Sequence, residues 1–301
     1  MPPVCVILGP TASGKSALAH AVAKAAGAVV LAVDSMTVYR GMDIGTAKPT
    51  TAERAEVDYR GLDVAKPDET YSVADWLAVA DTVFAEGRPV VAAGGTPLYY
   101  QSLFRGMFEG PPADDDFRRE LAGWEERELQ RKLTEVDPEA AARIHRNDRK
   151  RLTRALEVRH LTGDTITSLQ QQWASGPDRV ASVRFGLSWP REELNRRINA
   201  RAKAMVAAGW LDEVRGLLDR YGELSPSARE AAGYRYLGDV VRGRMKLDDA
   251  LEQIKIKTRQ LAKRQMTWFR RFENVAWLPG DAPVEENARR VLEAWRPTLS
   301  P

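Results

Sequence analysis

The segment "VCVILGPTASGKSALAHAVAKAAG", residues 4–27, decides the fold of this chain. Its first residues, "VCVILG", form an unbroken apolar run that is typical of a strand buried on both faces of a sheet. From Lys15 onward, apolar residues recur at helical spacing, and Gly27 is a typical helix end. Between strand and helix lies the spacing Gly-x4-Gly-Lys-Ser/Thr, filled by Gly9, Gly14, Lys15 and Ser16.

This spacing predicts a phosphate-binding loop, because a strand precedes it and a helix follows it. The glycines allow successive backbone N–H groups to turn inward, and the helix N-terminus adds partial positive charge. Lys15 offers a full positive charge, and the Ser16 hydroxyl can ligate Mg²⁺. The loop alone does not identify the phosphate, because a kinase, an ATPase and an enzyme that releases pyrophosphate would all use it.

The alternation of strands and helices continues along the chain. Further strands are predicted at 28–35, 89–96, 180–189 and 274–280, and a helix is predicted at 72–87. Buried strands that alternate with helices predict an α/β fold, in which helices flank a parallel sheet. From about Phe117 to Trp173 the sequence is helical, charged and free of strand-like runs. We therefore expect an α/β core formed by 1–111 plus 179–301, interrupted by a helical insertion domain at 112–178.

Composition restricts the class of protein. The chain has 301 residues, of which 44% are hydrophobic and 29% are charged, as is ordinary for a soluble globular protein. No apolar run approaches the roughly 20 residues of a membrane helix, and the first residues do not resemble a signal peptide. The single cysteine, Cys5, excludes a disulfide framework, and three scattered histidines argue against a histidine metal site. We expect a cytoplasmic protein without a membrane partner.

The distribution of charge is more informative than the net charge of +3. Segments 143–160 and 255–271 are strongly basic, and the second contains no acidic residue. In the first, Lys150 and Arg154 lie on the helix face opposite an apolar stripe. Either basic face could be an ordinary solvated surface. Two such faces beside a phosphate-binding core favour an RNA partner.

Asp34 follows the second predicted strand. The carboxyl end of a parallel strand is the edge at which α/β proteins bind ligands. A carboxylate at this place could orient Mg²⁺, or it could act as a general base. It could also be a turn or N-cap residue, since Asp-Ser favours both. Spacing alone does not decide among these roles.

Five segments together resemble the tRNA dimethylallyltransferase family. They are "GPTASGKS" (9–16), "DSMTVYRGMDIGTAKP" (34–49), "AGGTPLYYQSL" (93–103), "NDRKRLTRALEV" (147–158) and "KTRQLAKRQMTWFRR" (257–271). The resemblance implies a P-loop NTPase-like fold. It also implies transfer of a dimethylallyl group from dimethylallyl diphosphate to N6 of the adenosine 3′ of a tRNA anticodon, with release of pyrophosphate. Mg²⁺ would be the cofactor and the anticodon stem-loop the partner. The sequence gives no clear signal for an oligomer, so we expect a monomer.

The resemblance also implies roles for single residues. The diphosphate would be held by Gly9, Pro10, Thr11, Ala12, Ser13, Gly14, Lys15, Ser16 and Arg201. The catalytic set would be Asp34, as the base for the adenine amine, with Lys15, Ser16 and Thr96, and Ser16 would ligate Mg²⁺. The tRNA contacts would be Asp34, Ser35, Met36, Thr37, Thr96, Arg118, Lys150, Arg151, Leu152, Thr153 and Arg154. Thr37 and Pro97 depart from residues that are frequent in the family, and Thr37 could alter nucleotide contact.

Three other functions compete with this interpretation. A small-molecule kinase shares the loop but does not need a long basic C-terminal helix. An RNA-binding ATPase would normally have an apolar run that ends in Asp-Glu, which this sequence lacks. An enzyme that prenylates free adenine nucleotides would need neither the basic insertion nor the basic tail. Whether ATP is ever a ligand, and which tRNAs are substrates, cannot be deduced from the sequence.

Overall fold

The computed structural model describes residues 2–107, 110–170 and 177–299. They form two compact units: 1–103 together with 180–301, and the continuous stretch Phe104–Arg179. The insertion expected at 112–178 falls within the second unit. Trp173, whose helical spacing predicts a packing residue, lies outside the described residues.

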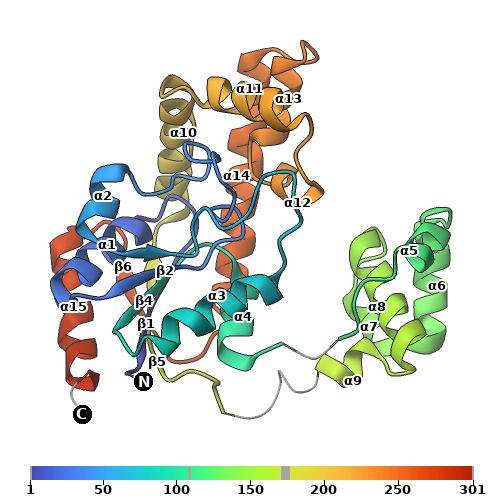
Figure 1. Ribbon diagram of the computed structural model, residues 1–301, viewed down its shortest axis with the longest axis horizontal. Coiled ribbons are helices and arrows are strands. Elements are labelled where there is room, and N and C mark those ends of the chain that lie inside the picture. The colour runs from blue at the N-terminus through green and yellow to red at the C-terminus, as the bar shows by residue number, and fades with distance from the viewer. Residues whose placement is uncertain (1, 108–109, 171–176, 300–301) are drawn as a thin grey trace. The chain divides into compact units, whose positions relative to one another are not determined.

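The first unit is built on a six-stranded sheet (Figure 1). Its strands are β1 (Val4–Leu8), β2 (Val29–Ala32), β3 (Tyr59–Arg60), β4 (Val90–Ala93), β5 (Ser182–Ser188) and β6 (Val275–Pro279). The order is β3-β2-β4-β1-β5-β6, and every neighbouring pair is parallel. The predicted α/β class with a parallel sheet is confirmed. The two-residue strand β3 was not predicted, because it is too short to show an apolar pattern.

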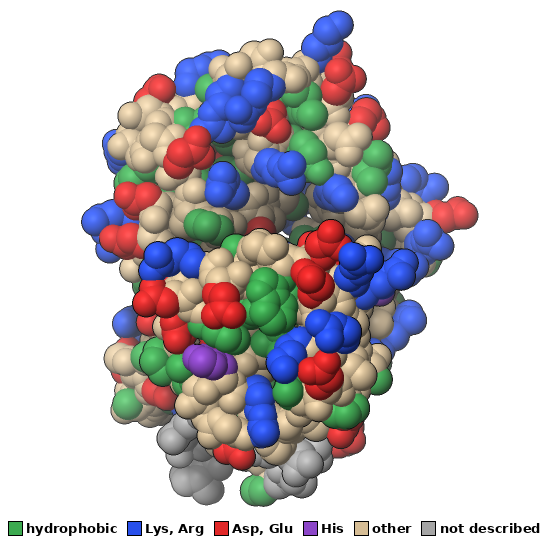
Figure 2. Space-filling model, turned by 90° about the vertical axis from the view of Figure 1, so that its right-hand side faces the viewer, with side chains coloured by type: hydrophobic (Ala, Val, Ile, Leu, Met, Phe, Trp, Pro, Cys, Tyr) green, Lys and Arg blue, Asp and Glu red, His purple; other side chains and the backbone are tan. Residues whose placement is uncertain are grey.

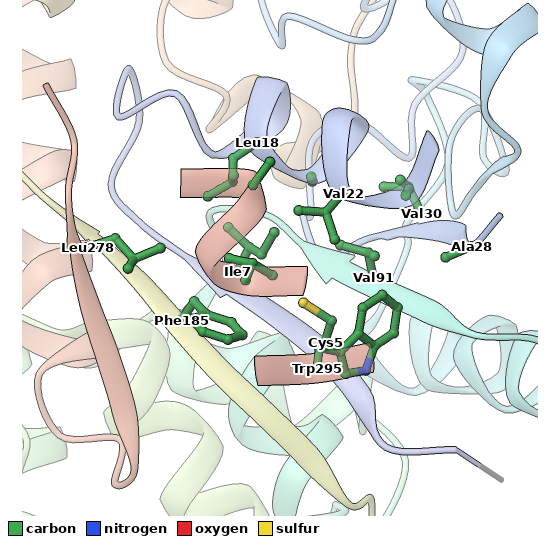
Figure 3. Packing of buried hydrophobic residues seen from close by; sticks show 14 of the residues in the cluster. Cys5, Ile7, Leu18, Val22, Ala28, Val30, Val91, Phe185, Leu278 and Trp295 are labelled. Atoms are coloured by element: carbon green, nitrogen blue, oxygen red, sulfur yellow. The ribbon is translucent and has the colours of Figure 1, made fainter. Parts of the chain in front are cut away.

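Helices α1 (Lys15–Ala26) and α15 (Val284–Trp295) cover one face of the sheet. Figure 3 shows Leu18 and Val22 of α1 packed over Ile7 and Cys5 of β1, with Trp295 of α15 beside them. Side chains on a strand alternate between the two faces, so every second residue of β1 enters this core. The apolar run 4–8 is buried throughout because the opposite face is covered as well.

The remaining helices of the first unit are formed by the segments between the strands. They are α2 (Thr51–Glu56), α3 (Val73–Ala85), α4 (Pro97–Arg105), α10 (Arg191–Ala207), α11 (Trp210–Tyr221), α12 (Pro226–Arg229), α13 (Tyr234–Val241) and α14 (Leu247–Phe269), followed after α15 by the 3₁₀ turn Arg296–Thr298. The last residues of α4 belong to the second unit. The indole of Trp76 in α3 donates a hydrogen bond to the carbonyl of Ala32, at the end of β2.

A second core of the first unit lies beyond the carboxyl edge of the sheet. It packs the loop after β2, including Tyr39 and Met42, against α11, α13 and α14. Trp210, whose helical spacing predicts a packing residue, is 1% exposed in this core. Figure 1 shows α11 and α13 at one end of the first unit, with the long helix α14 running from there toward the sheet. This core holds the 34–49 loop, which lines the same cavity as the phosphate-binding loop.

In the second unit, the described residues between 110 and 170 form a series of short helices. They are α5 (Asp115–Ala122), α6 (Glu126–Val136), α7 (Pro138–Arg143), α8 (Arg149–Thr162) and α9 (Ile166–Gln170). Leu129, Leu133, Leu152 and Val158 are each fully buried in its core. None of the helices in the described stretches of the whole chain combines the length and hydropathy that a bilayer-spanning segment needs.

Candidate active site

The phosphate-binding loop joins β1 to α1 as the spacing predicted. Gly14 has a φ of +94°, a left-handed conformation that glycine adopts without strain. No side chain caps the first turn of α1. The N–H groups at this helix start are therefore available to an anion, and the helix dipole favours negative charge there.

Lys15 points its ammonium group into the loop. The side chain is buried, and Nζ donates to the carbonyl of Pro10 at 3.3 Å. Burial lowers the pKa of Lys15 to about 8; the Asp34 carboxylate opposes this shift and Arg201 adds to it. The Lys15 ammonium therefore lies in a poorly solvated place that an incoming anion would stabilise.

Asp34 and Thr96 form one hydrogen-bonded turn at the ends of β2 and β4. Asp34 Oδ1 accepts the Met36 N–H at 2.9 Å, and Thr96 Oγ1 accepts the Ser35 N–H at 2.9 Å. The Thr37 hydroxyl donates to the Asp34 carbonyl at 3.4 Å. Thr96 therefore holds the backbone beside Asp34, which fixes the direction of the carboxylate.

These elements surround one pocket of about 240 Å³. The predicted site residues among its lining are Thr11, Ala12, Lys15, Ser16, Asp34, Met36, Thr37 and Arg201. Burial lowers the pKa of Arg201, which the charge of Asp34 opposes. The pocket also has an apolar wall, formed by Ile198, Ala202, Met205, Trp210, Ile254 and Leu261. One cavity thus combines cationic groups, a carboxylate and an apolar surface.

The loop 41–49 closes part of this pocket and is held by two residues that the sequence did not single out. Glu213 of α11 accepts three consecutive backbone N–H groups, from residues 43–45, at 2.6 to 3.3 Å. Lys48 is 9% exposed and donates to Asp43, to Asp63 and to the carbonyl of Tyr39. The "GMDIGTAKP" segment is therefore a braced loop rather than a free one.

Three more side chains anchor the phosphate-binding loop from outside. Trp189 donates its indole N–H to the Ser13 carbonyl at 2.9 Å. Arg197 donates to the Ala12 carbonyl at 2.9 Å and stacks over the Trp189 ring at 4.3 Å. Gln265 of α14 accepts the Thr11 N–H at 2.8 Å. Trp189 and Arg197 lie outside the five segments of the resemblance. Gln265 lies in the last of them, but its spacing does not reveal a contact with a loop 254 residues away.

The donor set at the loop fits Mg²⁺. Ser16 is exposed and lines the pocket, and Asp34 faces the same space, so both present oxygen atoms of the kind that Mg²⁺ prefers as ligands. Within the described part of the chain, no three His, Cys, Asp or Glu side chains are grouped as a metal site. A P-loop does not need such a group, since its serine and the phosphates provide ligands.

The remaining predicted tRNA contacts lie in the second unit, and most already have protein partners. Arg118 and Arg154 both bind Glu157, whose side chain has no exposed surface. Arg151 is exposed and forms an ion pair with Asp148 at 3.4 Å. Leu152 is fully buried, so its side chain packs in the core and offers no surface to RNA. Lys150, Arg151 and part of Arg118 stay exposed.

A basic groove of about 770 Å³ lies on the first unit along α13 and α14. Arg235, Lys257 and Arg264 line it and are exposed. Other cations of the groove are paired, as Arg242 is with Glu223 and Arg244 with Asp239. Figure 2 shows lysine and arginine side chains gathered in the upper part of the view, at the end of the first unit that holds α11 and α13.

Fold and site together define an α/β protein with a P-loop at the carboxyl edge of a parallel sheet. The family model described as IPP transferase matches residues 37–272, and the model described as Isopentenyl transferase matches residues 2–63. The chain belongs to the IPP transferase family.

Named relatives resemble the chain over nearly its whole length. A tRNA dimethylallyltransferase of Symbiobacterium thermophilum is 44% identical, covering 97% of this chain and 96% of the relative. A tRNA dimethylallyltransferase of Methylococcus capsulatus is also 44% identical, covering 98% of each. The solved full-length tRNA isopentenylpyrophosphate transferase of Bacillus halodurans is 34% identical, with a TM-score of 0.73 over 99% of this chain and 97% of that one.

Proposed function

We propose that this chain transfers a dimethylallyl group from dimethylallyl diphosphate to N6 of the adenosine 3′ of a tRNA anticodon, releasing pyrophosphate. One observation carries the proposal: Lys15, Arg201 and Asp34 line a single pocket that also has an apolar wall. The cations suit a diphosphate leaving group, the wall suits a prenyl chain, and the carboxylate suits a proton acceptor. The named relatives perform chemistry of this class.

On the donor side, the bond that breaks joins the allylic carbon to a diphosphate oxygen. The N-terminal N–H groups of α1, Lys15 and Arg201 stabilise the negative charge that grows on that oxygen. Bound Mg²⁺, held by Ser16 and the diphosphate, would supply further charge neutralisation. The apolar wall excludes water, which would otherwise compete for the allylic carbon.

On the acceptor side, the bond that forms joins N6 of adenine to the allylic carbon. The exocyclic amine is a weak nucleophile and must lose a proton as it reacts. Asp34 accepts that proton, and its hydrogen bond from the Met36 N–H keeps the carboxylate oriented. The adenosine reaches the pocket by leaving the loop stack, which costs a few kcal/mol and less for an unpaired base.

The basic groove supports RNA as the acceptor. Arg235, Lys257 and Arg264 are exposed cations without ion pairs among residues 2–107, 110–170 and 177–299. Contacts between such cations and phosphates release counterions, which offsets the cost of extruding a base. A small-molecule kinase and an enzyme for free adenine nucleotides would have no use for this surface.

We further propose that the enzyme acts as a monomer in the cytoplasm.

The test is a product assay. The protein is incubated with Mg²⁺, dimethylallyl diphosphate and an anticodon stem-loop carrying adenosine at the last anticodon position and at the next one. The expected result is RNA whose mass rises by one dimethylallyl group, together with released pyrophosphate. Parallel reactions replace the donor with ATP and the RNA with AMP. Phosphate transfer from ATP without any RNA adduct, or prenylation of AMP but not of RNA, would overturn the proposal.

A further inference from the structure

Gln265 is a buried amide between the two halves of the pocket. It lies in α14, is 5% exposed and lines the cavity. Its Oε1 accepts the Thr11 N–H at 2.8 Å, and its Nε2 donates to the Gly95 carbonyl at 2.6 Å. The partners fix this orientation of the amide, because a backbone N–H only donates and a carbonyl only accepts. Both ends of the side chain are therefore committed to backbone groups distant in sequence.

On the diphosphate side, Gln265 sets the direction of one peptide group. The Pro10 carbonyl and the Thr11 N–H belong to the same trans peptide, so they point in opposite directions. With the N–H held by Gln265, the Pro10 carbonyl faces the loop interior. There it accepts Lys15 Nζ at 3.3 Å and the Ser13 N–H at 3.2 Å. Gln265 thus determines where Lys15 rests before the diphosphate binds.

On the acceptor side, the same amide packs against the backbone beside Asp34. A Cβ added at Gly95 would lie 2.7 Å from Gln265 Nε2 and 3.1 Å from Asp34 Oδ2. The amide and the carboxylate therefore flank the same side of Gly95, and only glycine leaves room for both. The next residue, Thr96, holds the Ser35 N–H and with it the turn of Asp34.

We propose that Gln265 is a positioning residue that fixes the distance between the leaving-group site and the base. It does not touch the reacting atoms: it orients Lys15 through the Pro10–Thr11 peptide and supports Asp34 through Gly95. This inference rests on the proposed prenyl transfer. Its value to the reaction is alignment, since a displacement of about 1 Å between reacting groups can cost about 100-fold in rate.

The test compares Gln265→Met, Gln265→Glu and the control Gln260→Met, which alters an exposed glutamine of the same helix. Single-turnover rates are measured with saturating RNA and saturating dimethylallyl diphosphate, alongside the Kd for RNA and the melting temperature. We expect Gln265→Met to slow the reaction by about 10- to 100-fold while the Kd for RNA changes less than about twofold. The control should match the wild type.

Gln265→Glu tests the pH dependence of the rate, which would not change if Gln265 only stabilised the fold. A neutral glutamic acid can accept from Thr11 and donate to Gly95 as the amide does, whereas a glutamate has lost the donor. The rate of this variant, divided by that of the wild type, should therefore rise as the pH falls from about 8 to about 5.5. A ratio that stays flat, or a Gln265→Met rate equal to that of the control, would overturn the inference. Failure of the wild type to modify RNA would instead overturn the proposed function.

Discussion

The arginines beside Glu157 in the second unit and the arginine beside Asp34 in the first unit differ in how many hydrogen bonds their guanidinium groups make. In the second unit, Glu157 accepts from Arg118 at 2.7 and 3.1 Å, from Arg154, and from the Asp114 N–H at 2.9 Å. In the first unit, Arg201 lies near Asp34, yet the described part of the chain supplies its guanidinium with no hydrogen bond or ion pair.

This difference distinguishes arginines that stabilise the fold from an arginine that is available to bind a ligand. A buried carboxylate surrounded by three donors is already satisfied, and breaking such a cluster costs stability. A half-buried guanidinium without an acceptor has lost hydration and gains most from an incoming anion. Sequence alone could not make this distinction, because Arg118, Arg154 and Arg201 were all predicted to bind ligands.

The largest loss of rate is expected on substitution of Asp34, the proposed general base. Asp34→Ala should lower the single-turnover rate by about 10²- to 10⁴-fold, because the adenine amine loses its proton acceptor. Asp34→Asn keeps the shape and should be nearly as slow. Binding of the stem-loop, measured by fluorescence anisotropy, should persist in both variants. A near-normal rate in either variant would remove Asp34 from the mechanism.

Arg201→Gln should lower the rate by about 100-fold, because a charge aimed at the leaving group is lost. Its melting temperature should stay close to that of the wild type, since no protein partner is broken. Lys203→Gln, on an exposed turn of the same helix, is the matched control and should be as active as the wild type. A large loss of stability in Arg201→Gln would show that Arg201 stabilises the fold, as Arg118 and Arg154 do, and would contradict its assignment as a ligand-binding residue.

A smaller effect is expected from pH. Burial lowers the pKa of Lys15 to about 8, so below about pH 8 the group is charged both with and without ligand. Above that pH, binding of pyrophosphate must take up a proton, and its affinity should fall by up to about tenfold per pH unit. Titration calorimetry should show this slope in the wild type and a flatter profile in Lys15→Met.

The smallest effect on catalysis is expected at Glu157. Glu157→Gln should leave the rate at saturating RNA within about twofold of the wild type. It should destabilise the second unit by about 1–3 kcal/mol, because two arginines lose a charged partner. The pKa of Glu157 is held below its usual value despite burial, by Arg118 and Arg154. This stabilisation is therefore present above about pH 4.5 and is lost as pH falls through the lowered pKa. An unchanged melting temperature at pH 7 would count against a structural role.

The sequence carried enough information for most of the sheet and for the phosphate-binding loop. Five strands were predicted because each is a largely apolar run; β1 and β2 are buried throughout, whereas β6 is mostly exposed. Lys15 and Ser16 followed from the spacing of the phosphate-binding motif. Asp34 was placed correctly at the pocket because its position after β2 fixes it at the carboxyl edge. The role of each of these residues stays a prediction.

The anchors could not be predicted, because they depend on contacts between distant segments. Glu213 lies about 170 residues from the loop that it holds, and Gln265 lies 254 residues from Thr11. One feature of the sequence does indicate a special role for Gln265. On the apolar face of 251–272, Thr258 and Gln265 are polar residues at core-facing spacing, and both line the pocket. A polar residue on a buried face needs a partner, and that need indicates a site.

The strand order also governs when the site can form. β1, which begins the phosphate-binding loop, pairs on one side with β4 and on the other with β5, about 180 residues later. The indole of Trp295 reaches back to the Pro3 carbonyl at 2.7 Å. Strand β1 therefore lacks one of its two neighbours until β5, about 180 residues further along the chain, has been made. The helices of the second unit, by contrast, make mostly local contacts. Refolding should show the second unit gaining structure first and pyrophosphate binding appearing last.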